Sequence, residues 1–475
     1  MTCHDRVHVT AGRRLPTRVG LCLVLMMLGT ALGAAPRAAA QDAPASLASS
    51  GQAAPPASSP AAPPFPNRMN DALPTWLRVR GEFRGRLEGF DGAGFNKGRD
   101  DLYWLNRFRF NATFRPGSSV AVTVQGQDAR VQKKTTGSGG PPFRDVFDLR
   151  MAYVEVGSAS APVSVRIGRQ ELVFGEQRLV GHVSWVNTAR TFDAVRVSIQ
   201  RPHLQVHAFG SSVVAIDAAR FNTSGSGSWF SGAYGIASAL VPKSTVEPFV
   251  FWRREADIRT ERGTVADLSA VTAGGRWAGG LPSGLSYDTE MAVQFGSVGP
   301  DRVRAWAGHW RARQPIGSGL PARVVGEYNF ASGDGDPTDG RRETFDQLFP
   351  TAHDKYGLSD QVGWRNIHHL STGIELTPRP RLQLGTSYHS WWLASRQDAL
   401  YSAGSAVVAR VPGGALSRHV GQEIDVQAAY RLSSELQVAA GYAHVFTGPF
   451  LREATPGAAY SGSYLMLTYV FLAAQ

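Results

Sequence analysis

From residue 76 onward, apolar or small residues alternate with polar and charged ones. In the first such segment, residues 76–89, one face carries Leu, Val, Phe and Gly, whereas the other carries only Arg and Glu from Arg78 to Glu88. Residues 103–116 and 419–431 repeat the pattern. Because successive side chains of a β-strand point to opposite faces, the alternation predicts strands that separate an apolar from a polar environment.

Eighteen such segments follow one another along the chain. Connections after even-numbered segments are tight, as at 116–117, 201–202, 377–379 and 433–434, whereas most connections after odd-numbered segments are longer, up to residues 332–364. The predicted strands are residues 76–89, 103–116, 118–130, 146–157, 162–171, 191–200, 203–214, 229–240, 246–257, 266–278, 284–297, 302–314, 320–331, 365–378, 380–395, 419–431, 434–447 and 461–473.

The pattern predicts an all-β fold, a transmembrane antiparallel β-barrel of about 18 strands with short periplasmic turns and long extracellular loops. An even number of strands, each of about ten or more residues, is typical of outer-membrane barrels. The alternative is a soluble β-sandwich, but sandwich strands average about 5–6 residues. The last segment is aromatic and apolar, as in barrel-ending strands, although four residues follow its final aromatic residue, Phe471.

Residues 1–40 have the layout of a cleaved secretory signal. Four arginines precede the apolar run from Val19 to Leu28, and Ala38-Ala39-Ala40 provides a small-residue cleavage site. A membrane anchor is the alternative, but a helix needs about 20 apolar residues to cross a bilayer. We expect a signal peptide over 1–40, an Ala/Pro/Ser-rich flexible periplasmic tail over 41–75, and a barrel over 76–475 in the outer membrane of a Gram-negative-type bacterium.

Composition and charge narrow the function. The chain has 49 Lys and Arg against 38 Asp and Glu, a formal charge of +11. Such a charge suggests a nucleic-acid partner, but a secreted protein rarely meets nucleic acid, and removal of the signal, with five Arg and one Asp, lowers the charge to +7. Cys3 and Cys22 both lie in the signal, so the mature chain is expected to hold neither a disulfide nor a thiolate metal site.

The polar face of the strands should line the lumen, and many arginines lie on it. Mixed charges could brace the wall as ion pairs, and surplus guanidinium groups could attract an anionic solute, because Arg confers anion selectivity on pores and binds carboxylates with two hydrogen bonds. Both interpretations can hold together. The candidate lumen residues are Arg78, Arg80, Arg84, Arg86, Arg107, Arg109, Arg115, Arg150, Arg166 and Arg323, interleaved with Glu82, Glu88, Asp148, Glu290, Glu327 and Asp425.

Two long segments carry a family resemblance. The first is residues 165–181, VRIGRQELVFGEQRLVG, followed by WVN at 185–187 and RTFDAVR at 190–196; the second is residues 344–357, TFDQLFPTAHDKYG, followed by GWRN at 363–366. They resemble the hallmark segments of the alginate-export family of outer-membrane porins, and the resemblance covers roughly residues 76–473. The motif residues are Gly168, Arg169, Gln170, Glu171, Gly175, Arg178, Asp193, Arg196, His353, Asp354 and Trp364.

The resemblance implies an eighteen-stranded monomeric barrel whose arginine-rich lumen passes an anionic uronate polymer across the outer membrane. One departure is visible in the sequence. The alginate exporter of this family is plugged by a long periplasmic turn before its last two strands, whereas the corresponding turn here is Ser433-Ser434. The sequence therefore leaves open both gating by such a plug and alginate as the specific cargo.

Other candidate chemistry is weaker. Asp334, Asp336 and Asp339 resemble the start of a calcium loop, but residue 345 is Phe where an EF-hand loop needs Glu, so a solvated acidic loop is the preferred interpretation. His353 is expected to be a loop or packing residue, as are His368 and His369, which would point to opposite faces of a strand. No G-x-S-x-G motif stands at a strand-to-helix junction.

We expect no cofactor and no catalytic residue. The expected partners are outer-membrane lipid, an anionic saccharide or other anionic solute, and the barrel-assembly machinery, with no nucleic acid and a monomeric state. The predicted function is a passive outer-membrane channel with an arginine-rich lumen for an anionic, alginate-like polysaccharide or another acidic solute. The alternatives are a general or substrate-specific uptake porin on the same scaffold and a barrel-borne hydrolase. A TonB-dependent transporter is disfavoured because no globular plug precedes Trp76. The direction of transport, and whether residues 332–364 fold into the lumen, stay open.

Overall fold

The computed structural model describes residues 69–157, 161–238, 240–317 and 321–472. The predicted signal peptide, most of the predicted tail and both cysteines lie outside these residues. The short helix α2 (Met69–Ala72) precedes the first strand. The Asn70 side chain donates hydrogen bonds to the carbonyl oxygens of Val79, in the first strand, and of Leu472, directly after the last strand. It therefore connects this helix to the first strand and to the end of the last one.

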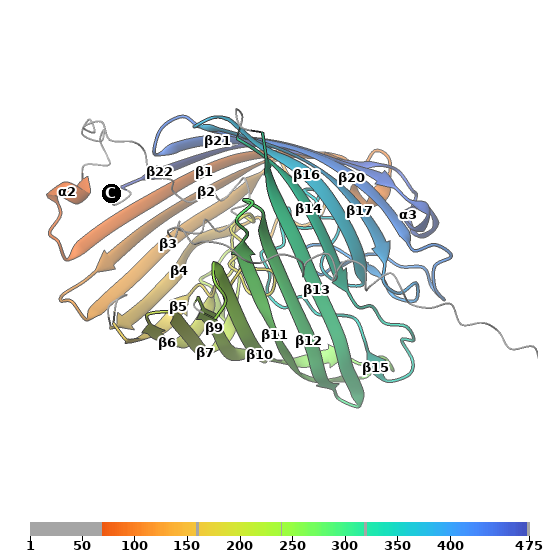
Figure 1. Cartoon of the computed structure of the whole chain (residues 1–475), viewed down its shortest axis with the longest axis horizontal. Coiled ribbons are helices and arrows are strands. Elements are labelled where there is room, and N and C mark those ends of the chain that lie inside the picture. Colours follow the sequence, from red (N-terminus) through yellow and green to blue (C-terminus); the bar gives the residue numbers. More distant parts are fainter. Residues whose placement is uncertain (1–68, 158–160, 239, 318–320, 473–475) are drawn as a thin grey trace, which may run out of the picture. The chain divides into compact units, whose positions relative to one another are not determined.

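The chain forms a closed antiparallel β-barrel of eighteen strands (Figure 1). Each strand pairs with its neighbours along the chain, and pairing of β1 with β22 closes the barrel. The barrel strands are β1 (Leu77–Asp91), β2 (Asp101–Phe114), β3 (Val120–Gln132), β4 (Asp145–Val156), β5 (Val163–Gln170), β6 (Phe192–Arg201), β7 (Leu204–Ala215), β9 (Ser228–Ala237), β10 (Ser244–Arg259), β11 (Val265–Gly280), β12 (Ser286–Val298), β13 (Asp301–Ile316), β14 (Ala322–Ala331), β16 (Ile367–Arg379), β17 (Leu382–Leu393), β20 (His419–Arg431), β21 (Leu436–Thr447) and β22 (Tyr460–Phe471).

The loops at one end of the barrel contain several short helices and strands. They are the 3-10 turn η1 (Ala93–Phe95), the short strands β8 (Thr223–Ser224) and β15 (Arg341–Arg342), the hairpin of β18 (Leu400–Tyr401) and β19 (Val407–Ala409), and the helix α3 (Pro449–Ala454). No helix in the described part of the chain is long and apolar enough to cross a membrane.

The predicted fold is confirmed. Each of the eighteen predicted strands overlaps one observed strand, and its ends differ by three residues at most. The two ends of the barrel also differ as expected, since residues 432–435 join β20 to β21 whereas residues 332–366 join β14 to β16. Two connections at the long-loop end, 260–264 and 299–300, are short as well.

The outer face of the barrel is apolar, in agreement with the period-two pattern. On β12, the outward side chain of Val293 is 52% exposed, whereas the inward side chain of Glu290 is 5% exposed. Exposed Phe, Trp, Val and Leu side chains recur on the outer face of other strands, for example Phe108 on β2 and Trp252 on β10. Such a surface is suited to contact with lipid chains.

Two of the long loops fold into the barrel. They are residues 171–191, between β5 and β6, and residues 332–366, between β14 and β16. They pair through a parallel bridge between Val180 and Phe349, and the Phe349 amide donates to the Leu179 carbonyl at 2.9 Å. The segment from Ser332 to Trp364, whose position the sequence left open, therefore packs against the 171–191 loop.

The 171–191 loop crosses the interior, because it contacts strands that lie far apart around the wall. Arg84 of β1 donates to the Ser184 carbonyl at 2.9 Å, whereas Arg178 pairs with Glu327 of β14 at 3.0 Å. These two contacts span the lumen, so the loop occupies space that a wide-open pore would leave to water.

The inner face between β6 and β10 differs from the expected polar lining. Phe230 and Phe251 are 0% and 1% exposed, and Phe174 of the 171–191 loop stacks on Tyr234 with ring centroids 4.9 Å apart. They belong to a buried cluster that also includes Trp364 of the 332–366 loop. An inward-folded loop supplies the apolar partners that a water-filled lumen lacks, so aromatic residues are stable inside this sector of the wall.

Candidate functional site

A cavity of about 700 Å³ lies along the inner face of β1 to β5, and His182 and Ser184 of the 171–191 loop form part of its lining. Burial lowers the pKa of His182, so this imidazole is neutral at pH 7. Arginines outnumber carboxylates around the cavity, six to three. Its charged lining residues are Arg80, Arg107, Arg109, Arg115, Arg150, Arg166, Glu82, Glu155 and Glu171.

Arg109 on β2 forms no salt bridge with any carboxylate in the part of the chain that the structure describes. Its side chain is 8% exposed, and no carboxylate of the described residues lies within 4 Å of it. Nε donates to Gln127 Oε1 at 2.8 Å, whereas Nη2 has no hydrogen-bond partner among the described residues. A buried guanidinium with free donors is stabilised by an anion that accepts from it. Arg109 therefore places a guanidinium with an unpaired donor in the wall of this cavity.

The positive charge of Arg150 on β4 is partly compensated by a carboxylate. It pairs with Glu171 at the start of the 171–191 loop and donates to Gln125 Oε1 at 2.6 Å. Burial would raise the pKa of Glu171, but the adjacent Arg150 outweighs burial and lowers it to about 2. Glu171 is therefore ionised at neutral pH, and its pairing with Arg150 fixes the loop to the wall.

Three further arginines of this wall bind the backbone of the same loop. Arg84 and Arg86 lie on β1 and Arg107 lies on β2, and their side chains are 5%, 2% and 3% exposed. Their bonds run from Arg84 to Ser184 O (2.9 Å) and Val186 O (3.3 Å), from Arg86 to Trp185 O (2.6 Å), and from Arg107 to Ser184 O (2.9 Å) and Val186 O (3.3 Å).

Trp185 joins the two inward loops to the wall. Its ring stacks on His353 of the 332–366 loop, with centroids 3.7 Å apart and planes 4° from parallel, and the Arg86 guanidinium lies 3.8 Å from its centroid. His353 Nδ1 is 2.8 Å from Asp360 Oδ2. A second cavity, of about 290 Å³, is lined by Arg86, Trp185 and His353 among others.

The His353 contact predicts a pH dependence. Burial lowers the pKa of His353, but the Asp360 carboxylate outweighs burial and the net pKa is raised above its ordinary value. A raised histidine pKa stabilises the folded state below the unfolded-state pKa of about 6.5, and this stabilisation is lost as the pH rises through the folded-state pKa. The free energy of unfolding in detergent, measured with a denaturant, should therefore be higher for the parent than for His353→Gln. This difference should be larger at pH 5.5 than at pH 9. An equal difference at both pH values would contradict the charged contact.

The remaining predicted arginines lie in different places. Arg78 donates to the carbonyl oxygens of Pro74 and Leu77 at the short-turn end of β1, and Arg80 is exposed in the first cavity. Arg166 pairs with Glu155 at 2.5 Å. Arg323 is exposed on β14 and is not among the residues that line this cavity.

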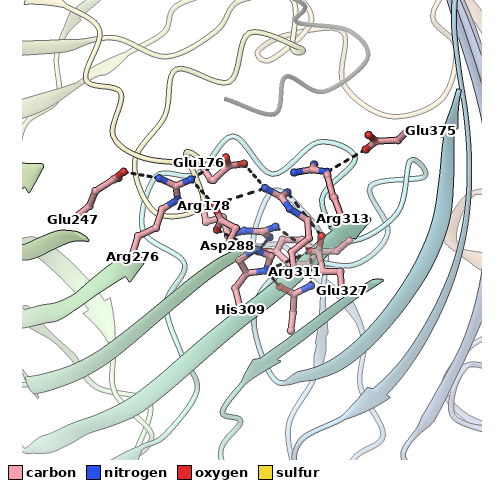
Figure 2. A network of polar contacts seen from close by, with 12 residues as sticks. Glu176, Arg178, Glu247, Arg276, Asp288, His309, Arg311, Arg313, Glu327 and Glu375 are labelled. Carbon is pink, nitrogen blue, oxygen red and sulfur yellow. Dashed lines mark hydrogen bonds and ion pairs between the residues drawn. The ribbon is translucent and has the colours of Figure 1, made fainter. Parts of the chain in front are cut away.

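The wall formed by β11 to β16 is different, because its arginines are matched by carboxylates. Arg276 contacts three carboxylates, those of Glu247 at 2.6 Å, Glu176 at 3.3 Å, and Asp288. Figure 2 shows these contacts side by side with those of Arg178, His309, Arg311 and Arg313, which reach Glu327 and Glu375. Of the two interpretations drawn from the sequence, ion-pair bracing describes this wall, whereas surplus positive charge describes the wall of the first cavity.

Several family-motif residues hold the 171–191 loop against the wall. Gly168 has φ +121°, and a Cβ there would lie 2.3 Å from the Ala152 carbonyl oxygen, so β5 can pair closely with β4 only with glycine at this position. Arg169 donates from Nε and Nη2 to the two oxygens of the Asp193 carboxylate, at 2.8 and 3.1 Å, and so joins the two ends of the loop. Gln170 donates to the Ala194 carbonyl at 3.1 Å.

Gly175 and Trp364 of the motif also lie against the wall. Gly175, with φ +50°, passes so close to the wall that a Cβ would lie 2.6 Å from the Tyr234 hydroxyl. Trp364 donates from its indole to the Phe330 carbonyl at 2.9 Å. Arg196 lies opposite Arg166 in the β5–β6 register, and Asp354 follows His353 in the 332–366 loop.

The weak metal candidates do not converge. Asp336 accepts from the Thr338 hydroxyl at 2.7 Å, and Asp339 accepts from the Arg341 amide at 2.8 Å. Among the described residues, no group of three or more His, Cys, Asp or Glu side chains could hold a metal ion. His369 is buried and bonds to Asn329 and His389, whereas His368 meets Tyr328 on the outer face, as their alternation predicted.

Residues that sequence reasoning missed also shape the site. Gln127 supports Arg109 and donates to the Thr188 carbonyl at 3.0 Å. The Asn187 side chain lies within 3.0 to 3.1 Å of the carbonyl oxygens of Asn106, Arg130 and Phe143, and so anchors the loop. A glutamine on a polar strand face gives no local signal of these contacts, whereas Asn187 stood inside the first resemblance segment.

Comparisons with known proteins agree with the barrel fold. A family model described as alginate export matches residues 75–462. No curated protein matches the chain. Among solved structures, Pseudomonas aeruginosa OccK11 (OpdR) is 13% identical with a TM-score of 0.56, over 83% of this chain and 96% of that one. OccK3 (OpdO) from the same organism is 14% identical with a TM-score of 0.55, over 83% and 95%. Its OccK2 (OpdF), solved in complex with glucuronate, is 12% identical with a TM-score of 0.56, over 83% and 98%.

Proposed function

The chain belongs to the alginate export family of outer-membrane channels, and from this premise we propose that it passively conducts an anionic saccharide or a similar acidic solute along the wall of β1 to β5. The observation that carries the proposal is the buried Arg109, which no carboxylate of the described residues neutralises, beside a cavity with six arginines and three glutamates. Cationic groups in a low-dielectric wall raise the local concentration of anions and exclude cations.

The comparison with OccK2 supports a sugar acid as the solute. That porin has a similar barrel and was solved with glucuronate. A uronate carries one carboxylate, which a guanidinium can bind with two parallel hydrogen bonds. Arg109 and its neighbours offer that chemistry here.

Charge selectivity tests the proposal. In planar bilayers under a salt gradient, the purified channel is expected to show an anion-selective reversal potential. The Arg107→Ala, Arg109→Ala double variant should lose most of this selectivity. Arg323→Ala is the matched control, because Arg323 is exposed on the wall across the barrel and is not among the lining residues of this cavity. Cation preference in the parent, or an equal loss in the control, would overturn the proposal.

A second candidate, uptake of small acidic solutes, is favoured by the filled interior. The two cavities have volumes of about 700 and 290 Å³, in the range of sites for small molecules. In swelling assays with channel-bearing liposomes, glucuronate is then expected to enter at least tenfold faster than a long uronate polymer. Comparable permeation by the polymer would favour the export of polysaccharide.

A further inference from the structure

The two cavities meet at a layer of three arginines and one loop segment. On the inner face of β1, Arg80 and Glu82 line the first cavity, Arg86 and Glu88 line the second, and Arg84 lies between them. The 171–191 loop shows the same order, because Ser184 lines the first cavity and the next three residues line the second. We call this layer the partition; it consists of Arg84, Arg86, Arg107 and residues 184–187.

Neutral acceptors hold the partition closed. The three guanidinium groups donate to the carbonyl oxygens of Ser184, Trp185 and Val186. A carboxylate carries a full negative charge and can accept two parallel hydrogen bonds from one guanidinium, whereas a carbonyl oxygen is neutral and single. A carbonyl oxygen therefore holds these donors less strongly than a carboxylate would.

The charges in the partition are not balanced. Arg86 pairs with Glu88 and Arg107 pairs with Glu82, each at 2.6 Å. Arg84 has no carboxylate of the described residues within 4 Å, and its Nε has no hydrogen-bond partner among them, although the side chain is 5% exposed. A buried cation without a counter-ion raises the free energy of the site and favours capture of an anion.

We propose that the partition is a carboxylate-exchange site. A carboxylate that enters from either cavity takes the guanidinium donors that Ser184, Trp185 and Val186 occupy, and the displaced segment joins the two cavities. Binding of the solute thus opens the path along which the solute moves. This inference rests on the proposed function in one respect, that the ligand is an acidic solute of the channel.

The displacement is confined to a short segment, because both of its ends are fixed. Asn187 is bound to three backbone carbonyl groups of β2, β3 and the 133–144 loop. Before the segment, the Val183 amide donates to Thr351 Oγ1 at 2.9 Å. Trp185 leaves its place between Arg86 and His353 when its carbonyl is released, so the contact between the two inward loops weakens as well.

Hydrogen exchange of the full mature chain in detergent, followed by mass spectrometry, tests the exchange. With sodium glucuronate at constant ionic strength, the amides of residues 182–188 should exchange at least twofold faster than with sodium chloride. Glucose, which has a similar size and no charge, should have no effect. Residues 289–296 of β12 serve as the internal reference, because none of them lines either cavity.

Two glutamate variants sharpen the test. Glu82 accepts from Arg107 Nε and Nη2 at 3.0 and 2.6 Å, so Glu82→Gln removes the negative charge that holds these donors, while Nη1 keeps its bonds to the loop. The glucuronate concentration that gives half of the exchange effect should fall at least threefold. Glu155→Gln is the matched control, because Glu155 lines the same cavity but pairs with Arg166 outside the partition. It should change that concentration less than 1.5-fold.

The outcomes separate this inference from the proposed function. Unchanged exchange at residues 182–188 in a channel that is anion-selective would overturn the exchange site and leave the proposed function standing. An equal shift in both glutamate variants would also overturn it. A channel without anion selectivity would refute the proposed function, whereas faster exchange with glucuronate would still support the site. Should Glu82→Gln fail to fold, the comparison of glucuronate, chloride and glucose on the parent decides the question alone.

Discussion

Replacing Arg276 by leucine is expected to destabilise the folded channel more than any surface substitution. Arg276 is the centre of three carboxylates, and the side chains of Arg276, Glu176, Glu247 and Asp288 are 11%, 4%, 7% and 7% exposed. Burial would raise the pKa of Glu176, but its cationic neighbours, Arg311 foremost, lower it, so the carboxylate is charged at neutral pH. Removal of Arg276 leaves these carboxylates without their central cation. Loss of one partner from a buried ion pair costs about 3–5 kcal/mol.

Denaturant unfolding in detergent micelles measures this loss. Arg341→Leu is a suitable control, because Arg341 is 60% exposed and meets Asp339 only at 4.0 Å, and such surface changes stay within about 0.5 kcal/mol. The variant should also conduct more current, since Glu176 then no longer holds the 171–191 loop to β11. A loss of stability below about 1 kcal/mol in Arg276→Leu would show that the network is not needed for folding.

Glu327→Gln is expected to have a similarly large effect at the other end of the same network (Figure 2). Glu327 pairs with Arg178 at 3.0 Å, and the Arg178 side chain is 1% exposed. Burial would lower the pKa of Arg178, but Glu327 outweighs it, so the net pKa is raised and the guanidinium stays charged. The amide of the variant keeps the shape but not the charge, and an uncompensated buried cation costs about 3–5 kcal/mol.

A double variant separates charge from packing. Arg178→Met with Glu327→Leu replaces the pair by apolar side chains, and such replacements of buried ion pairs are often neutral. We expect it to recover at least half of the stability that Glu327→Gln loses, by the same unfolding measurement. The single variant should also raise the open-channel conductance, because the loop loses its contact with β14. A double variant as unstable as the single one would show that the hydrogen bonds of Glu327, for example from Asn329 at 2.8 Å, dominate instead.

The wall of this protein could be predicted from its sequence, because lipid and the interior impose opposite requirements on alternate residues. The alternation in β1 gave both the strand and the inward face of Arg84 and Arg86. It failed at Phe251 on β10, whose inward position depends on an apolar cluster that includes residues of distant loops. No periodicity marks such loops, since their partners are set by the folded wall and not by neighbours in the chain.

Of the candidate site, the sequence predicted the arginines but not the groups that they contact. Arg107 and Arg109 stood on the polar face of a strand, and their place in the interior followed from that. Their partners did not, because the carbonyl oxygens of Ser184 and Val186 are backbone atoms that any sequence would offer. Family resemblance marked residues 165–187 as special without showing that this segment docks against β1 and β2.

The contacts of the 171–191 loop also bear on the order in which the molecule is assembled. Arg84 lies 100 residues before Ser184, and Tyr356 lies 178 residues after Arg178. Contacts of such long sequence separation form late, because the chain between the partners loses entropy when it is closed. Phe174 stays exposed until the strands up to β10 have formed. Val180 stays exposed until Phe349 packs against it. The loop therefore docks only after the strands that carry its partners have formed, and a chain arrested before β14 leaves apolar side chains of the loop without the partners that bury them.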